Sequence, residues 1–85
     1  MREKTVVVNL RQGFHIRPAT QFVKAASAFK SAIRLKKNGN TADAASIVGL
    51  IALGIKNGDE VVLSADGPDE QEAIAVLEGI LKGGE

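Results

Sequence analysis

The chain contains no cysteine, tryptophan or tyrosine, and only one histidine and three phenylalanines among its 85 residues. Without cysteine it can form no disulfide framework, no thiolate metal ligand and no cysteine nucleophile. A single histidine also argues against zinc, which usually takes several Cys or His ligands. We therefore expect no metal and no cofactor, and a fold that relies on regular helices and strands.

Long apolar runs are missing as well. The longest, residues 47–55, has nine residues, whereas a helix needs roughly 20 to span a bilayer. The N-terminus lacks the apolar segment of a signal peptide. We therefore expect a cytoplasmic protein without membrane insertion, and the length predicts one domain over residues 1–85.

Charge is distributed unevenly along the chain, although the net charge is +1. Residues 1–43 carry nine Lys or Arg and two acids, whereas residues 44–85 carry two Lys and eight acids. This asymmetry suggests an anionic partner for the first half, unless folding intermixes the halves. Nucleic acid is the less fitting partner because three phenylalanines are too few for a base-stacking platform.

Hydrophobic spacing predicts the secondary structure. Period-two patterns predict strands over residues 5–10, 32–36, 41–43 and 60–65. Helical spacing predicts helices over residues 16–28 and 47–53, and a last helix that ends at Lys82-Gly83. Asn38-Gly39 is a hairpin signal, Ser46 can cap the short helix, and Asp69 with Glu72 has the spacing of a capping box.

The order of these elements restricts the topology. A right-handed crossover through the first helix would place strands one and two parallel, with a gap that the fourth strand fills in antiparallel pairing. The expected fold is α+β, with a four-stranded antiparallel sheet in the order 1-4-2-3 and three helices on one face.

His15 is the only side chain whose unperturbed titration falls near neutral pH. It lies between the turn at Gly13 and the first predicted helix, at or beside the helix N-cap. The positive end of the helix dipole favours a neutral, nucleophilic ring, and the free N–H groups of the first turn can receive an anion. Arg17 adds a fixed charge suited to phosphate oxygens. The alternative is an ordinary capping histidine beside a solvated arginine.

The segment Gly13-Phe14-His15-Ile16-Arg17-Pro18-Ala19 closely resembles the active-site signature of HPr. HPr proteins are the phosphocarriers of the bacterial phosphoenolpyruvate-dependent sugar phosphotransferase system, and the resemblance extends over essentially the whole chain. It implies an open-faced β-sandwich and a carrier rather than an enzyme. It further implies that Nδ1 of His15 accepts a phosphoryl group from phosphorylated enzyme I and passes it to the IIA component of a sugar permease, with the assistance of Arg17.

The short helix over residues 47–53 is apolar almost all round, so a domain of this size cannot bury every face of it. The alternative, that these side chains are all core, fits Leu50 and Leu53. The resemblance implies a docking surface for enzyme I and IIA that consists of Thr20, Lys24, Ile47, Val48 and Ile51. A relay needs rapid release, so we expect weak binding and a monomer.

Ser46 has two open interpretations. It can be an N-cap with no further role. In HPr proteins of Gram-positive type, the serine at this place is phosphorylated by a regulatory kinase (HPr kinase/phosphorylase), which promotes binding to a transcription regulator. Ala45 departs from the lysine that often precedes this serine. The alternative function is therefore an HPr-like regulatory phosphoprotein, of nitrogen or catabolite-control type, that is not dedicated to sugar transport.

Overall fold

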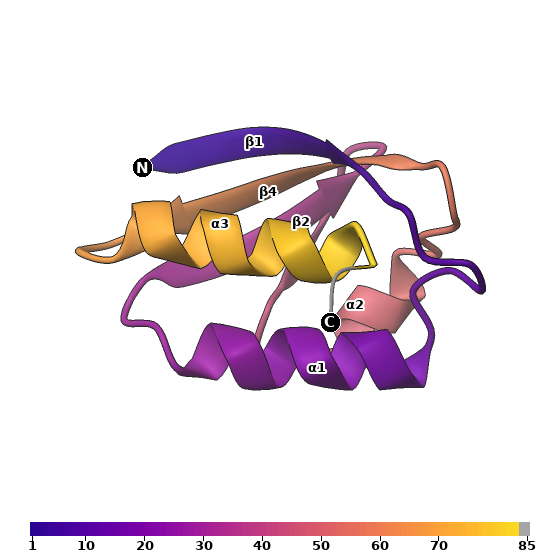
Figure 1. Cartoon of the computed structure of the whole chain (residues 1–85), viewed down its shortest axis with the longest axis horizontal. Helices are drawn as coiled ribbons and strands as arrows, with labels where there is room; N and C mark the ends of the chain where they lie inside the picture. The colour runs from indigo at the N-terminus through magenta and orange to yellow at the C-terminus, as the bar shows by residue number, and fades with distance from the viewer. Residues whose placement is uncertain (84–85) are drawn as a thin grey trace.

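The computed structural model describes residues 1–83, which form four strands and three helices in the predicted order (Figure 1). The elements are β1 (Arg2–Val7), α1 (Ile16–Ser27), β2 (Ala32–Lys37), β3 (Asn40–Asp43), α2 (Ile47–Ala52), β4 (Glu60–Asp66) and α3 (Glu70–Leu81). No helix within residues 1–83 is long and apolar enough to cross a membrane.

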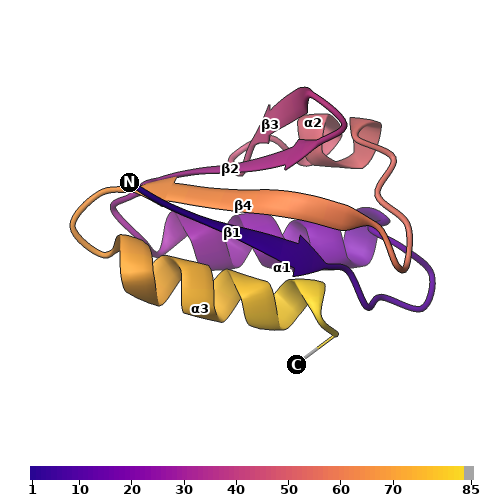
Figure 2. The ribbon, with the colours of Figure 1, turned by 90° about the horizontal axis from the view of Figure 1, so that it is seen from above.

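The four strands make one sheet in the order β1-β4-β2-β3, and every neighbouring pair is antiparallel. Figure 2 shows this order, with α1 and α3 side by side across one face of the sheet. In Figure 1 all three helices lie on the same side, and α2 packs against α1 and β3. The predicted α+β class and strand order are confirmed.

The core lies between the sheet and the helices. In β4, for example, Val61, Leu63 and Ala65 are buried whereas Val62 and Ser64 are only half-buried. This alternation places every second side chain under the helices, as the period-two pattern predicts. Phe22, Leu50 and Leu77 complete the core from the three helices, and full burial of each such side chain is worth about 1.5–3 kcal/mol.

The hairpin between β2 and β3 is built as its sequence predicts. Asn38 and Gly39 both have positive φ, at 51° and 84°, and Lys37 pairs with Asn40 across the turn. Two consecutive positive φ values are what a two-residue type I′ turn requires, and Asn-Gly is the favoured pair for it.

The first strand begins and ends earlier than the predicted residues 5–10. It starts at Arg2, because the edge pairing with β4 extends to Arg2 opposite Ala65. It ends at Val7 because the next residue bonds to a turn instead of a strand. The N–H of Val8 donates to the carbonyl of Asp59 at 2.8 Å, and the N–H of Gly58 donates to the carbonyl of Val8 at 2.7 Å.

The predicted capping box of Asp69 and Glu72 is wrong. Asp69 stands at the N-cap of α3, but its carboxylate makes no cap hydrogen bond. It accepts instead from the hydroxyl of Ser31 at 2.6 Å and from the backbone N–H groups of Lys30 and Ser31 at 2.8 and 3.1 Å. The Ser31 hydroxyl and these N–H groups lower the pKa of Asp69. The carboxylate therefore ties the loop after α1 to the start of α3.

Candidate functional site at the start of α1

The loop that carries His15 is fixed by backbone hydrogen bonds on its N-terminal side. The N–H of Gly13 donates to the carbonyl of Leu10 at 2.8 Å, and the N–H of Phe14 donates to the carbonyl of Ile55 at 3.0 Å. Gly13 has a φ of 78°, and a Cβ at this position would lie 3.0 Å from the Ile55 oxygen. Glycine thus allows both the turn and the close approach of this loop to the segment that contains Ile55.

Phe14 anchors the same loop in the core. Its ring is buried and meets Phe22 edge-on, with 5.8 Å between the ring centroids. His15 follows directly and is exposed. Because its neighbour is buried and its backbone enters α1, the imidazole is presented to solvent from a fixed position.

The segment that supplies the Ile55 carbonyl is itself held by an ion pair. The ammonium of Lys37 donates to Asp59 at 2.7 Å and to the carbonyl of Gly54 at 2.7 Å. The Asp59 carboxylate also accepts the N–H of Lys56 at 2.8 Å. The bonds to Asp59, that from Lys37 first and then that from the Lys56 N–H, lower the pKa of this carboxylate.

His15 is the N-cap of α1, as predicted. Its backbone is extended (φ −89°, ψ −168°), and its carbonyl accepts from the N–H of Ala19 at 3.0 Å. Nδ1 accepts from the N–H of Arg17 at 3.4 Å. Nδ1 therefore carries the lone pair in the neutral ring, and the proton is on Nε2. A group bound to Nδ1 would meet the N–H groups of the first helical turn.

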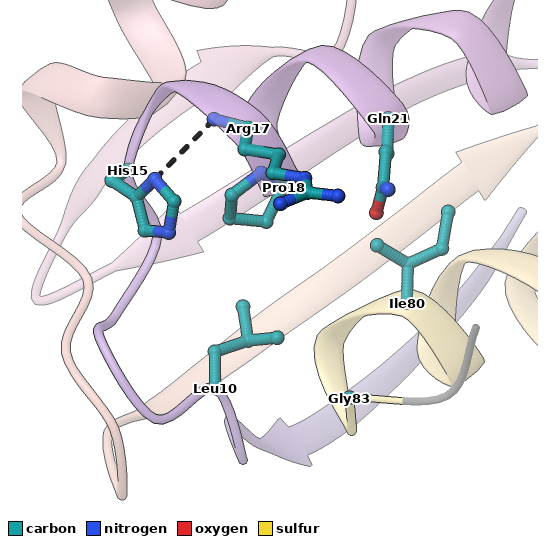
Figure 3. Close-up of a pocket in the computed structure, with 7 residues that line it drawn as sticks. All are labelled: Leu10, His15, Arg17, Pro18, Gln21, Ile80 and Gly83. Carbon is teal, nitrogen blue, oxygen red and sulfur yellow. Dashed lines mark hydrogen bonds between the residues drawn. The ribbon is translucent and has the colours of Figure 1, made fainter.

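A pocket of about 200 Å³ opens beside the imidazole. Figure 3 shows its lining, which consists of Leu10, His15, Arg17, Pro18, Gln21, Ile80 and Gly83. The predicted pair, His15 and Arg17, thus shares one pocket. The Arg17 side chain extends past Pro18 toward Gln21, and its guanidinium points away from the imidazole (Figure 3).

The sequence does not predict four of the lining residues, namely Leu10, Gln21, Ile80 and Gly83. Gln21 carries a weak signal, because it lies one helical turn after Arg17. Ile80 lies in the last turn of α3 and Gly83 just after the helix, and this end of the helix is bound to the loop before His15. There the N–H of Asn9 donates to the carbonyl of Leu81 at 2.9 Å, and its side-chain amide donates to that of Lys82 at 3.5 Å.

The predicted docking residues lie on the two helices that meet beside the site, since α1 and α2 pack against each other. Val48 is 80% exposed and Ile51 is 37% exposed, which leaves an apolar surface in solvent. Lys24 is exposed on α1, whereas Thr20 and Ile47 are half-buried. Sequence reasoning missed Ile16, which is 66% exposed and directly follows His15.

Leu50 and Leu53 differ from these neighbours. Leu50 is fully buried, and Leu53 is half-buried and packs against the core. The apolar short helix therefore divides into a core side and an exposed side.

Ser46 caps α2 as predicted. Its hydroxyl oxygen accepts from the N–H of Gly49 at 3.0 Å, and the residue is exposed. No three His, Cys, Asp or Glu side chains gather as a metal site within residues 1–83.

A family model described as "PTS HPr component phosphorylation site" matches residues 2–83. The chain belongs to the HPr family. It is 42% identical over 81 residues to the phosphocarrier protein HPr of Vibrio cholerae, with 95% of each chain covered. It is also 44% identical over 77 residues to the HPr-like protein Crh of Bacillus subtilis, with 91% of each covered.

The HPr fold is confirmed by solved structures. The crystal structure of HPr-C-His from Thermoanaerobacter tengcongensis superposes with a TM-score of 0.91 at 41% identity, covering 100% of this chain and 99% of the other. The chain is thus a member of a phosphocarrier family, and it is about equally similar to an HPr and to a Crh.

Proposed function

We propose that this protein accepts a phosphoryl group from phosphorylated enzyme I on Nδ1 of His15 and passes it to the IIA component of sugar permeases. The observation that carries the proposal is the orientation of the imidazole. Nδ1 faces the N–H of Arg17 at the first turn of α1, while the side chain stays exposed to a donor. This function places the protein in the cytoplasm, where phosphoenolpyruvate is made.

The chemistry is a displacement at phosphorus. The Nδ1 lone pair forms the new P–N bond, the bond between phosphorus and the donor breaks, and its electron pair stays with the donor. The first-turn N–H groups and Arg17 then face a doubly negative group, which they stabilise as hydrogen-bond donors. Transfer to IIA reverses these steps with IIA as the acceptor.

The docking surface of this relay is the exposed side of α1 and α2, made of Thr20, Lys24, Ile47, Val48 and Ile51. An apolar centre with cations around it suits acidic partners and short encounters, because the charges raise the association rate more than the affinity. A carrier that meets two partners in turn needs this balance, and we propose that it acts as a monomer.

A labelling experiment tests the proposal. Phosphoenolpyruvate and enzyme I are expected to give an acid-labile, base-stable phosphate on the wild type, and added IIA is expected to remove it. His15→Ala is expected to take no phosphate. A label retained by this variant would exclude the histidine, and a label that IIA does not discharge would exclude the relay.

A second candidate is a regulatory HPr-like protein, favoured by the 44% identity to Crh and by the exposed Ser46. Here HPr kinase/phosphorylase would phosphorylate Ser46, and a transcription regulator would bind the product. ATP and the kinase would then give an acid-stable phosphate that Ser46→Ala abolishes. Ser27→Ala is the matched control, because Ser27 is an exposed serine on α1. The intact histidine favours the relay, since a purely serine-based regulator does not need it.

A further inference from the structure

A second pocket, of about 370 Å³, lies between the second half of α1, the start of β2 and the segment that joins β3 to α2. It shares no residue with the pocket beside His15. Because α3 packs against β1 and β4 (Figure 2), it does not reach this part of the sheet. Six of the nine lining residues are alanine or serine, and such small side chains leave space under α1. The volume is within the range of about 300–1,000 Å³ that is typical of small-molecule sites.

The floor of this pocket is apolar. Ala26, Ile33 and Ala44 line it and are only 8%, 4% and 2% exposed. Val23 lies beside them, half-buried and packed against the core. This floor can receive an aliphatic chain, because its side chains offer no hydrogen bond to a polar one.

The polar side chains that line the pocket are all hydrogen-bond acceptors. The hydroxyl of Ser27 donates its proton to a backbone carbonyl of α1 at 2.7 Å, and that of Ser31 donates to Asp69 at 2.6 Å. A hydroxyl has one proton, so both oxygens are left to accept. The Asp43 carboxylate also only accepts. Its Oδ1 takes the N–H of Ala45 at 2.8 Å, and the described residues give its Oδ2 no hydrogen bond.

The charge of the pocket is negative. Asp43 is the only charged residue among the described residues that line it. Arg34 lies opposite Asp43 in the register of β2 and β3, but the ion pairs within residues 1–83 do not include these two side chains. The carboxylate is therefore available to a cation from outside the chain.

We propose that this pocket binds a primary ammonium group on an aliphatic chain, with the ammonium at the acceptors of Asp43, Ser27 and Ser31 and the chain on the apolar floor. An ammonium has three donors and no acceptor, which matches a set of side chains that only accept. Anions such as phosphate are the opposite case and belong to the start of α1. The proposed amine site does not depend on phosphoryl transfer at His15, because His15 does not line it.

An NMR titration of the full chain with n-butylammonium tests the proposal. The reporter is the backbone N–H of Ala45, which donates to the Asp43 carboxylate. We expect saturable shifts over residues 43–45 with a Kd in the millimolar range, because the ligand has few atoms. n-Butanol has the chain without the charge, and tetramethylammonium has the charge without the donors. Each is expected to bind about 3- to 10-fold more weakly, and equal binding of either would overturn the proposal.

Chain length tests the apolar floor. Each CH₂ group added from n-propylammonium to n-pentylammonium is expected to raise the affinity by about 2- to 4-fold, because it removes apolar surface from water. An affinity that does not change with chain length would mean that the amine meets only an exposed carboxylate, and would refute the pocket as its site.

Asp43→Asn tests the carboxylate. The amide keeps an oxygen for the N–H of Ala45, but its NH₂ group presents donors in place of the second acceptor. We expect n-butylammonium to bind about 3- to 10-fold more weakly and n-butanol to be unaffected. Asp66→Asn, the same change at an exposed carboxylate outside the pocket, is the control and is expected to bind the amine like the wild type. Equal losses in the two variants would reduce the effect to net charge and contradict the proposal.

Two further arms sharpen the assignment. Arg34→Gln removes the cation opposite Asp43 and is expected to raise the affinity by up to about 2-fold, so weaker binding would contradict the charge argument. The second arm compares n-butylammonium with Nα-acetyl-lysine N-methylamide, which carries the same chain on a peptide backbone. Tighter binding of the free amine would assign the pocket to a small molecule, and tighter binding of the lysine derivative to a lysine side chain of a partner protein. Binding of neither would overturn the proposal.

Discussion

Two helices of this protein begin with a side chain that caps the first turn, and the two caps differ in what they leave free. Ser46 caps α2 with a bond of 3.0 Å from Gly49, a short contact that a hydroxyl commonly makes at this position. His15 caps α1 with a longer bond of 3.4 Å from Arg17. The serine cap needs no role beyond a structural one, whereas the histidine cap brings a ring nitrogen to the first-turn N–H groups, where we propose that phosphate is carried.

The surroundings differ in the same sense. The start of α1 has a pocket and an arginine beside it, and its preceding loop is bonded to two other segments. The start of α2 comes three residues after β3 and belongs to a helix of six residues, and among the described residues the short loop before it is bonded only to β2, through the N–H of Ala44 and the carbonyl of Ile33. The two caps are locally similar but have different surroundings, because long-range contacts decide which residues lie beside each of them.

The sharpest test of the α1 site is Arg17→Ala. Charge-assisted hydrogen bonds are worth about 1.5–3 kcal/mol, so phosphoryl transfer from enzyme I is expected to slow by roughly 10- to 100-fold. Rapid-quench measurements give the rate. Lys24→Ala, which removes an exposed cation about two helical turns further along α1, is expected to slow transfer less and chiefly at low salt. Equal effects of the two substitutions would mean that Arg17 acts only as a charge in docking.

Gly13→Ala tests whether the α1 start depends on its loop. A left-handed φ of 78° costs a residue with a Cβ about 1–2 kcal/mol, and the added atom also meets the Ile55 carbonyl. We expect urea unfolding to show this loss of stability and phosphoryl transfer to slow.

The control for Gly13→Ala is Gly79→Ala in the last turn of α3, where a Cβ meets nothing within 4 Å. This change is expected to stabilise the protein by about 0.5–1 kcal/mol. Stability of Gly13→Ala equal to that of the wild type would mean that the loop adapts.

Ser46→Ala tests the start of α2, which depends on its own capping side chain rather than on the preceding loop. Loss of the hydroxyl acceptor is expected to lower the free energy of unfolding by about 1 kcal/mol and to leave phosphoryl transfer from enzyme I unchanged. Thermal unfolding and the labelling assay measure the two quantities. Ser27→Ala, in the last turn of α1, is the control and is expected to be close to neutral. A slowed transfer in Ser46→Ala would show that the two helix starts are coupled.

The smallest expected effect comes from a feature that serves neither cap, the carboxylate of Asp69. Its pKa is lowered in the folded protein by the Ser31 hydroxyl and the Lys30 N–H. Because the folded pKa lies below the unfolded value of about 4, this stabilisation is present above that pH and is lost as the pH falls through the folded pKa.

Asp69→Asn is therefore expected to destabilise the protein at neutral pH and to differ less from the wild type in acid. Urea midpoints at pH 7 and pH 3 measure this. Glu60→Gln, at the exposed start of β4, is the control. If the stability of Asp69→Asn depends on pH as that of the wild type does, the Asp69 carboxylate does not contribute to acid unfolding.

Local features of this fold are predictable from the sequence, and pairings across the chain are not. Asn38-Gly39 encodes its turn within two residues, and Ser46 its cap within four. The start of β1 depends on which residues of β4 it meets, so the prediction began three residues late. The spacing of Asp69 and Glu72 suggested a local capping box. The Asp69 carboxylate instead accepts hydrogen bonds from Ser31 and Lys30, which lie 38 and 39 positions earlier in the sequence.

The site divides in the same way. His15, Arg17 and the helix N-cap follow from one short segment. The pocket that surrounds them needs the end of α3, which the sequence places at the other end of the chain. Only the folded structure shows that Ile80 and Gly83 are neighbours of the histidine.

The two ends of the chain are not equivalent for anyone who attaches a tag or a dye. The amino group of Met1 lies 3.5 Å from Asp66 and 3.3 Å from Glu70, at the end of the sheet where β4 finishes. Gly83, by contrast, forms part of the wall beside His15 (Figure 3). A group attached at Met1 lies away from the imidazole, whereas a group attached at Gly83 would stand at the pocket wall.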